Sequence, residues 1–232
     1  MIREGVGIII QARMGSSRLP GKVLKDFCGK TLLGRILERI GYLAEDMCIV
    51  VATSDLHQDD VIKEWCDENS IKCYRGDEKN VLCRYYECAK EFDLKHIVRM
   101  TGDNPFPDEE ELERLIDYHL KNSMDFSENF SELPIGVGME IFTFNALEDS
   151  VKYASLPKHF EHADEYILDN LKIYKHGVCR VDREKNFPDI RLTVDTDADY
   201  NKACYIFNKL QNKELNTVNI INICRYYEKE DI

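Results

Sequence analysis

None of the nine cysteines is spaced as in a metal-binding motif. No two of them form a C-x-x-C pair and no histidine lies at zinc-finger spacing, which argues against a structural zinc site. The number of cysteines is odd, and most of them lie among apolar residues, as Cys48 does before Ile49–Val51. We therefore expect free, mostly buried thiols in a reducing cytoplasm rather than a disulfide framework.

Long apolar runs and positive charge are also scarce. No stretch approaches 18 apolar residues and Met1–Glu4 does not begin a signal peptide, so we expect a cytoplasmic protein without a membrane span. The chain has 31 Lys and Arg against 43 Asp and Glu, a net charge of −12. A nucleic-acid binder generally needs a basic face, so this class is disfavoured. Repeats, low-complexity runs and linkers are absent too, which favours a single domain over residues 1–232.

What the sequence does contain is an apolar strand that leads into a cationic glycine loop. Val6–Ile10 is followed by glycines at positions 15 and 21 and by cations at positions 13, 18 and 22. The backbone N–H groups of such a loop, together with Arg and Lys side chains, are suited to bind a polyphosphate. The spacing fits neither the Walker motif G-x-x-x-x-G-K-[ST] nor the dinucleotide fingerprint G-x-G-x-x-G. The alternative is a solvated surface loop.

The rest of the chain alternates between short apolar runs and segments of helical periodicity, which predicts an α/β fold. We expect a mostly parallel, Rossmann-like sheet flanked by helices, with an arm that protrudes over residues 126–180 and begins with a polar loop at 126–140. The expected strands are Val6–Gln11, Cys48–Ala52, Ile71–Tyr74, His96–Met100, Met139–Phe144, Lys172–Val178 and Arg191–Val194. The expected helices are Leu32–Gly41, Asp59–Asn69, Val81–Phe92, Asp108–Lys121, Asn145–Tyr153, His159–Asn170, one that ends near Leu210, and Thr217–Tyr227.

Polar segments follow several predicted strands, at residues 12–22, 52–55 and 101–105. Ligands of open α/β sheets bind at the carboxyl ends of the strands, so these segments are expected to meet in one crevice. Asp103 and Asp195 each follow a predicted strand, and two carboxylates that face a cationic loop suit a hard cation such as Mg²⁺. The alternative is that Asp195 caps the next helix and Asp103 holds a turn.

Residues 9–24, Ile-Ile-Gln-Ala-Arg-Met-Gly-Ser-Ser-Arg-Leu-Pro-Gly-Lys-Val-Leu, resemble the signature of the cytidylyltransferases of cell-surface polysaccharide synthesis, in particular the spore-coat polysaccharide biosynthesis type. CMP-acylneuraminate and 3-deoxy-manno-octulosonate cytidylyltransferases are related to that group. The resemblance spans roughly residues 5 to 210 and continues in the expected order through residues 50–54, 75–86, 98–105, 136–142, 161–162 and 191–196.

The resemblance implies a nucleotide-diphospho-sugar transferase fold and Mg²⁺-dependent transfer of CMP from CTP, with release of pyrophosphate, to a sugar acid or a phosphorylated small molecule. By the resemblance, Arg13 and Lys22 contact the triphosphate with support from Arg18, and Asp103 and Asp195 hold the metal. The remaining residues of the implied nucleotide pocket are Gln11, Ala12, Met14, Gly15, Thr53, Asp77 and Arg84. Two of these have ordinary alternatives, since Asp77 also suits a helix start and Arg84 a surface cation.

The same resemblance places the acceptor in the arm, at Glu140, Glu161 and His162, and implies a homodimer joined through the arm. His162 is either a general base, an acceptor contact or an ordinary surface histidine. The chain departs from the family pattern twice: Gly138–Glu140 replaces Asp-Val-Glu, and His159-Phe160 replaces an acid–Arg pair. These departures leave the identity of the acceptor open.

Three other functions fit parts of the pattern. A sugar-1-phosphate nucleotidyltransferase that uses GTP or UTP keeps the fold and changes the base or the acceptor. A GT-A-like glycosyltransferase normally carries an Asp-x-Asp metal motif, and Asp195–Asp197 has these letters, but late in the chain and at a predicted helix start. A non-catalytic protein of this fold binds the nucleotide and releases no pyrophosphate.

Overall fold

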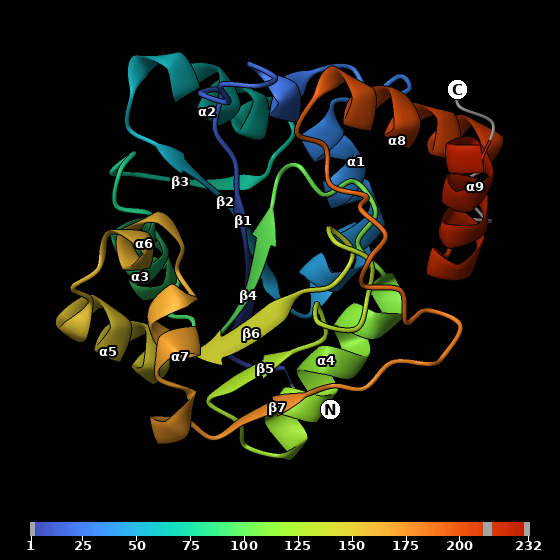
Figure 1. The fold of residues 1–232 in the computed structure, drawn as a ribbon. Helices are drawn as coiled ribbons and strands as arrows, with labels where there is room; N and C mark the ends of the chain where they lie inside the picture. Colours follow the sequence, from blue (N-terminus) through green and yellow to red (C-terminus); the bar gives the residue numbers. More distant parts are fainter. Residues whose placement is uncertain (1–2, 211–214, 230–232) are drawn as a thin grey trace.

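A seven-stranded sheet forms the centre of the computed structural model, which describes residues 3–210 and 215–229 (Figure 1). The strand order is β3-β2-β1-β4-β6-β5-β7, and β6 alone runs antiparallel to both of its neighbours. The strands are β1 (Val6–Gln11), β2 (Cys48–Ser54), β3 (Lys72–Gly76), β4 (His96–Thr101), β5 (Phe126–Glu128), β6 (Glu140–Thr143) and β7 (His176–Val178). The mostly parallel sheet flanked by helices, expected from the alternating pattern, is confirmed.

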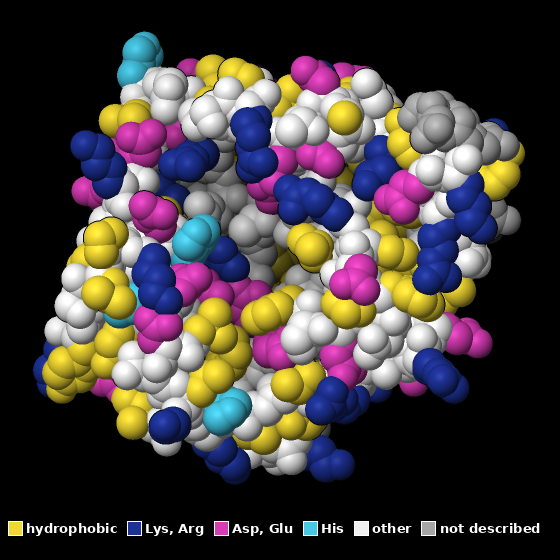
Figure 2. Space-filling view, viewed as in Figure 1, with side chains coloured by type: hydrophobic (Ala, Val, Ile, Leu, Met, Phe, Trp, Pro, Cys, Tyr) yellow, Lys and Arg dark blue, Asp and Glu magenta, His cyan; other side chains and the backbone are white. Residues whose placement is uncertain are grey.

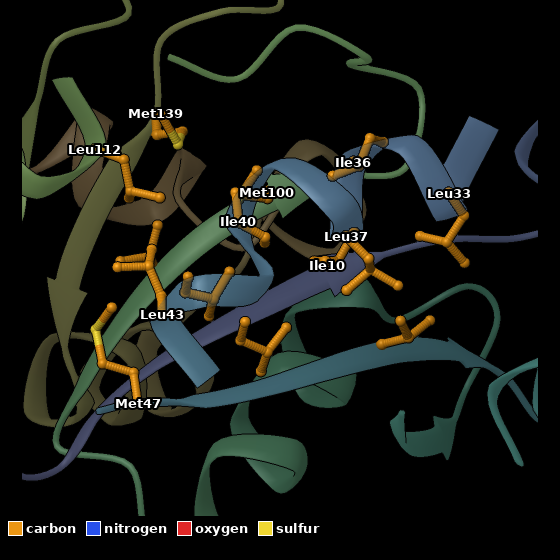
Figure 3. Packing of buried hydrophobic residues seen from close by; sticks show 14 of the residues in the cluster. Ile10, Leu33, Ile36, Leu37, Ile40, Leu43, Met47, Met100, Leu112 and Met139 are labelled. Atoms are coloured by element: carbon orange, nitrogen blue, oxygen red, sulfur yellow. The ribbon is translucent and has the colours of Figure 1, made fainter. Parts of the chain in front are cut away.

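Helices cover both faces of the sheet because side chains alternate along each strand. Ile8 and Ile10 of β1 pack in one apolar cluster with α1, α2 and α4, and Ile9 packs in another with α3, α5 and α7. Figure 3 shows the first cluster, in which the apolar stripe of α1 lies against Ile10 and Met100. The bounds are α1 (Leu32–Ile40), α2 (Asp60–Glu68), α3 (Val81–Glu91), α4 (Glu109–Lys121), α5 (Phe144–Tyr153), α6 (Pro157–Glu161), α7 (Glu165–Asp169), α8 (Asp197–Lys209) and α9 (Thr217–Lys229).

A third apolar cluster holds the C-terminal helices against the segment that precedes them. Leu192 and Val194 are buried together with Ile206 of α8 and Ile220 of α9. Short 3-10 turns complete the chain at η1 (Lys22–Leu24), η2 (Gly41–Glu45), η3 (His57–Asp59) and η4 (Leu171–Ile173). The structure thereby fixes residues 191–195 beside the sheet, although they form no strand of their own.

Four element predictions differ from the structure. The expected helix His159–Asn170 is two short helices, α6 and α7, because His162 has an extended backbone (φ −135°, ψ 132°). The expected strand Lys172–Val178 begins as η4 and is a strand only in β7. Arg191–Val194 makes a single bridge, to Ile135, instead of a strand. Conversely, β5 lies where a polar loop was expected, because Ser127 and Glu128 have hydrogen-bond partners inside the protein that allow their burial.

Residues 126–180 contribute β5, β6 and β7 to the common sheet and α5, α6 and α7 to one of its faces. A role of this segment in dimerisation stays a prediction. All nine cysteines are free thiols. Within residues 3–210 and 215–229, no helix has the length and apolar character needed to cross a bilayer.

Candidate active site

A cavity of about 700 Å³ lies at the carboxyl ends of β1 and β4. Two of the three polar segments expected there, 12–22 and 101–105, supply lining residues, whereas 52–55 supplies none of those identified. The amino end of β6 reaches the same edge of the sheet, because this strand is antiparallel to β4. Figure 2 shows the hollow on this face, with Lys, Arg, Asp and Glu side chains around it.

The cationic loop is held in shape by its own backbone and by one buried acid. Gly21 has a φ of 69°, and its N–H donates to the Met14 carbonyl at 3.0 Å, which closes the loop. The Met14 N–H donates to Asp59 Oδ1 at 2.7 Å and ties the loop to the start of α2. Arg13 and Arg18 are exposed and line the cavity, as do Ala12 and Gly15–Ser17. The loop therefore presents two unburied guanidinium groups to the same space.

Lys22 lies between the carboxylates of Asp103, which follows β4, and Asp195, which precedes α8. Its Nζ donates to Asp103 Oδ2 at 2.8 Å, to Asp195 Oδ1 at 2.9 Å and to the Val194 carbonyl at 2.8 Å. Asp195 also pairs with Arg18 at 3.0 Å and with Arg191. Burial tends to raise the pKa of Asp195, but the hydrogen bond and charge of Lys22 and the charges of the two arginines hold it below its usual value.

Local backbone contacts place both carboxylates. The Val194 N–H donates to the Asp103 carbonyl at 2.9 Å, so residues 191–195 run directly beside the turn after β4. Thr101 Oγ1 donates to Asp103 Oδ1 at 2.6 Å and orients its side chain. Asp195 does not cap α8: Thr196 is the N-cap, and its side chain accepts from the Asp199 N–H. The carboxylate of Asp195 is thus directed to the cavity rather than to the helix.

The pair Asp103 and Asp195 fits a divalent cation that also binds substrate phosphates. Among the residues that the structure describes, no three carboxylate, imidazole or thiol side chains form a cluster able to hold a metal on their own. Two carboxylates do converge on one point, and the ammonium group of Lys22 already takes the position of a shared cation there. Mg²⁺ commonly takes one or two protein carboxylates and completes its shell with phosphate oxygens and water.

The predicted nucleotide residues Gln11, Thr53 and Arg84 belong to the adjoining strands β1 and β2 and to α3. Thr53 is fully buried and Arg84 is 1% exposed, so Arg84 is not a surface cation. Gln11 Oε1, Thr53 Oγ1, and Nε and Nη2 of Arg84 are buried atoms without a hydrogen-bond partner. Arg84 Nη1 donates to the Asp77 carbonyl at 3.1 Å. Asp77 precedes α3 but does not cap it, because the N-cap is Asn80.

The other end of the cavity is built from Arg99, Glu140 and Asp164, with His162 beside them. Arg99 Nη1 donates to Glu140, and Arg99 Nε lies 3.7 Å from Asp164 Oδ1. Burial raises the pKa of Glu140 to about 7, although the Arg99 charge opposes the shift. Glu161 is exposed and is not among the residues that line the cavity.

Sequence reasoning missed Arg99 and Asp164. A guanidinium in the middle of the apolar strand His96–Met100 is the one signal that marks Arg99, because a buried charge needs a partner. Asp164 gave no comparable signal, since it lies inside a segment expected to be one continuous helix.

The sheet and the placement of these side chains define a nucleotidyltransferase. A family model described as cytidylyltransferase matches residues 7–230. The chain belongs to the cytidylyltransferase family, which confirms the resemblance seen in the sequence.

Individual relatives agree with this assignment. Over 206 residues the chain is 33% identical to the spore coat polysaccharide biosynthesis protein SpsF of Bacillus subtilis, covering 87% of this chain and 85% of that protein. It is 36% identical over 192 residues to an uncharacterized protein of Methanocaldococcus jannaschii, with coverage of 83% and 79%. A solved cytidylyltransferase of Leptospira borgpetersenii is similar with a TM-score of 0.86 and 33% identity, over 98% and 95% of the two chains.

The fold is also that of a CMP:2-keto-3-deoxy-manno-octonic acid synthetase whose structure was solved in complex with CTP. The TM-score is 0.66 and the identity is 18%, over 88% of this chain and 98% of the other. At this identity the likeness establishes a shared fold.

Proposed function

We propose that this protein transfers CMP from CTP to a sugar acid or a phosphorylated small molecule, releases pyrophosphate, and so supplies an activated precursor for a surface polysaccharide. The observation that carries the proposal is the single cavity in which the cationic loop faces Asp103 and Asp195. The relatedness to the spore coat polysaccharide biosynthesis protein SpsF supports the polysaccharide context.

Transfer of a nucleotidyl group needs in-line positioning and neutralisation of phosphate charge more than covalent help from the protein. An oxygen of the acceptor attacks the α-phosphorus of CTP, the bond to the bridging oxygen breaks, and pyrophosphate leaves. Arg13 and Lys22, supported by Arg18, neutralise the triphosphate and the departing pyrophosphate. The planar fork of Arg13 suits two phosphate oxygens at once.

Asp103 and Asp195 are the residues that would hold Mg²⁺. When bound, this ion neutralises phosphate charge and lowers the pKa of an oxygen nucleophile. Both carboxylates are held in place by Lys22 and by the contact between Val194 and Asp103.

A preference for cytosine is supported by the unpartnered polar atoms of Gln11, which lines the cavity, and of Thr53 and Arg84, which are buried and are not among the lining residues. Cytosine offers two acceptors, O2 and N3, to a guanidinium, and an amino group, N4–H₂, to side-chain oxygens. Uracil has a donor at N3 and an acceptor at O4, which reverses this pattern. We therefore propose CTP as the substrate rather than UTP.

The test is pyrophosphate release from each of CTP, UTP, GTP and ATP with Mg²⁺, against a panel of sugar acids and of sugar and polyol phosphates. Release with CTP and one acceptor is the expected result. Release with GTP or UTP alone would keep the fold and overturn the base. Binding of CTP without pyrophosphate release from any acceptor would favour the non-catalytic alternative, and release of nucleoside diphosphate from a nucleotide-sugar would favour a glycosyltransferase.

We further propose that the protein works as a homodimer. Sedimentation velocity measures this directly, and a monomer at the concentration of the activity assay contradicts it.

A further inference from the structure

The end of the cavity away from the cationic loop is acidic. Among the cavity-lining side chains on this side, Glu140 and Asp164 are carboxylates, Arg99 is a guanidinium and His162 is an imidazole. Arg99 is committed to both acids, with a hydrogen bond to Glu140 and a contact of 3.7 Å with Asp164. Burial tends to lower the pKa of Arg99, yet the two acids raise it above its usual value, so this guanidinium is held charged by its neighbours. The guanidinium on this side is therefore already paired with carboxylates.

The pairing inside this group is incomplete. Arg99 Nε and Asp164 Oδ1 are both buried without a hydrogen-bond partner, and 3.7 Å is too long for a direct bond between them. A buried donor and a buried acceptor left in this state are costly, and such groups normally find a partner in a ligand or an ordered water. The side chains of Glu140, Asp164 and Arg99 are 6%, 10% and 15% exposed. These three mostly buried side chains form what we call the floor of the cavity.

Part of the remaining cavity lining is apolar. Phe130 and Ile135 are 37% and 46% exposed although both are large hydrophobic residues, and Leu168 lines the same space. Exposed apolar side chains around a buried charged group are typical of a pocket that excludes water from its polar contacts. A ligand in this part of the cavity therefore places a polar group on the floor and carbon atoms against these apolar side chains.

We propose that Glu140 and Asp164 select an acceptor whose far end, away from the reacting oxygen, carries hydrogen-bond donors, either hydroxyl groups or an ammonium group, and that they reject an anion there. This inference rests on the proposed function for the direction in which the acceptor lies. It places a hydrogen-bond donor of the acceptor beside the two acids, away from the cationic loop that takes the triphosphate. Asp164 is the specificity-determining residue, because its Oδ1 is the acceptor left without a partner.

An anion is disfavoured at this floor because carboxylates outnumber guanidinium groups there. Two carboxylates and one guanidinium leave the floor with an excess of negative charge, which Glu140 relieves in part by its raised pKa of about 7. An added anion meets this excess in a poorly solvated place, whereas an ammonium group restores neutrality. A hydroxyl group gives a hydrogen-bond partner to both unpartnered atoms at once, because it accepts from Arg99 Nε and donates to Asp164 Oδ1.

The experiment compares glucamine, sorbitol and gluconate, which share a hydroxylated six-carbon chain and differ at one end by an ammonium, a hydroxyl and a carboxylate group. Binding is measured by saturation-transfer NMR at neutral pH with inorganic triphosphate present, so that the cationic loop is occupied. We expect glucamine to bind most tightly and gluconate most weakly, about tenfold apart, which corresponds to ~1.4 kcal/mol.

Variants of Asp164 and Glu140 test whether these two acids cause the preference for glucamine. Asp164→Asn, which keeps the shape and removes the charge, is expected to abolish the advantage of glucamine over sorbitol, and Glu140→Gln to reduce it. Glu165→Gln is the matched control, because Glu165 is the next residue but pairs with Lys158 and does not line the cavity. Thermal melting shows which variants are folded.

Binding of gluconate as tight as that of glucamine overturns the inference, as does an unchanged preference in folded Asp164→Asn, or no binding of any of the three polyols. None of these measurements needs turnover. A failure of the proposed function appears instead as a lack of pyrophosphate release from CTP with every acceptor.

Discussion

At the scale of single residues, Gly138 illustrates how closely the backbone is packed beside the site. A Cβ placed on Gly138 would lie 2.4 Å from Phe130 Cα and 2.8 Å from Phe130 N, both of them backbone atoms that cannot rotate away. We expect Gly138→Ala to lower the free energy of unfolding by about 1–3 kcal/mol, measured by urea denaturation. Gly41→Ala is the control, because a Cβ there meets nothing within 4 Å and Gly41 has a φ of −61°. Equal losses in the two variants would contradict the steric explanation.

The carboxylate of Asp103 is expected to matter for turnover and little for folding. Asp103→Asn keeps the side-chain volume and removes the charge that faces Lys22 and Asp195. We expect kcat to fall by at least about a hundredfold, the effect of losing one preorganised electrostatic group, with a melting temperature close to that of the parent. Asp197→Asn, an exposed acid on α8 that pairs with Lys25 at 3.2 Å, should leave kcat unchanged. Near-normal turnover of Asp103→Asn would refute a role in the metal site.

The sequence predicted those site residues that directly follow a strand. Asp103 and Lys22 were predicted to meet because the loop and the turn after His96–Met100 both lie at carboxyl ends of parallel strands, and this edge is a property of the fold class. Asp164 could not be predicted in the same way. Its position depends on the bend between α6 and α7, two short helices that contact α3 and α5 respectively.

At the scale of elements, strands and helices with one uniformly apolar side were predicted within a few residues. The failures share a cause: β5, β7 and residues 191–194 are short, and neighbours supply the contacts that place them. β7 pairs with β5 through only three residue pairs, and Arg191 has a single bridge. Such segments take their conformation from tertiary contacts, which override their weak propensities.

A pair of histidines, of which His119 is buried and His96 partly buried, joins β4, α4 and β5 and should make the fold sensitive to acid. His119 Nε2 lies 3.0 Å from His96 Nδ1, and His119 Nδ1 lies 3.1 Å from Ser127 Oγ. Burial, and then the nearby His96, lower the pKa of His119 from 6.5 to about 3. The pKa of His96 is lowered too, by burial and by Lys95. The folded protein therefore keeps His119 neutral at pH values where the unfolded chain is protonated.

This difference in bound protons sets the direction in which the free energy of unfolding changes with pH. Stability is expected to fall as pH drops below about 6.5 and to keep falling towards pH 3, by at most about 1.4 kcal/mol per pH unit from this one group. His119→Gln should reduce the slope of unfolding free energy against pH, measured by denaturation at a series of pH values. His176→Gln serves as the control, since His176 is an exposed residue of β7 that makes no ion pair with a carboxylate in the described part of the chain. A slope that is unchanged in His119→Gln would show that other groups cause the acid sensitivity.

At the scale of the whole molecule, the candidate active site is assembled from segments that are far apart in the sequence. Lys22, Asp103 and Asp195 meet within hydrogen-bond distance although the first and last are 173 positions apart. The antiparallel strand β6 brings Glu140 to the same edge of the sheet that the parallel strands define. One cavity therefore depends on the N-terminal loop, the middle of the sheet and the segment before α8, and local unfolding of any of them should empty it.

A ligand that bridges these segments should stabilise the entire fold. We expect CTP with Mg²⁺ to raise the free energy of unfolding by about 2.7 kcal/mol when its concentration is a hundred times its Kd, because it binds the folded state alone. UTP should give a smaller shift at equal concentration if Arg84 reads the base as proposed, since uracil has a donor at N3 where cytosine has an acceptor. Differential scanning calorimetry measures both, and EDTA should remove most of the shift that CTP gives. Equal shifts with CTP, UTP, GTP and ATP would mean that the cationic loop binds triphosphate without reading the base, and no shift with any of them would mean that the cavity is not a nucleotide site.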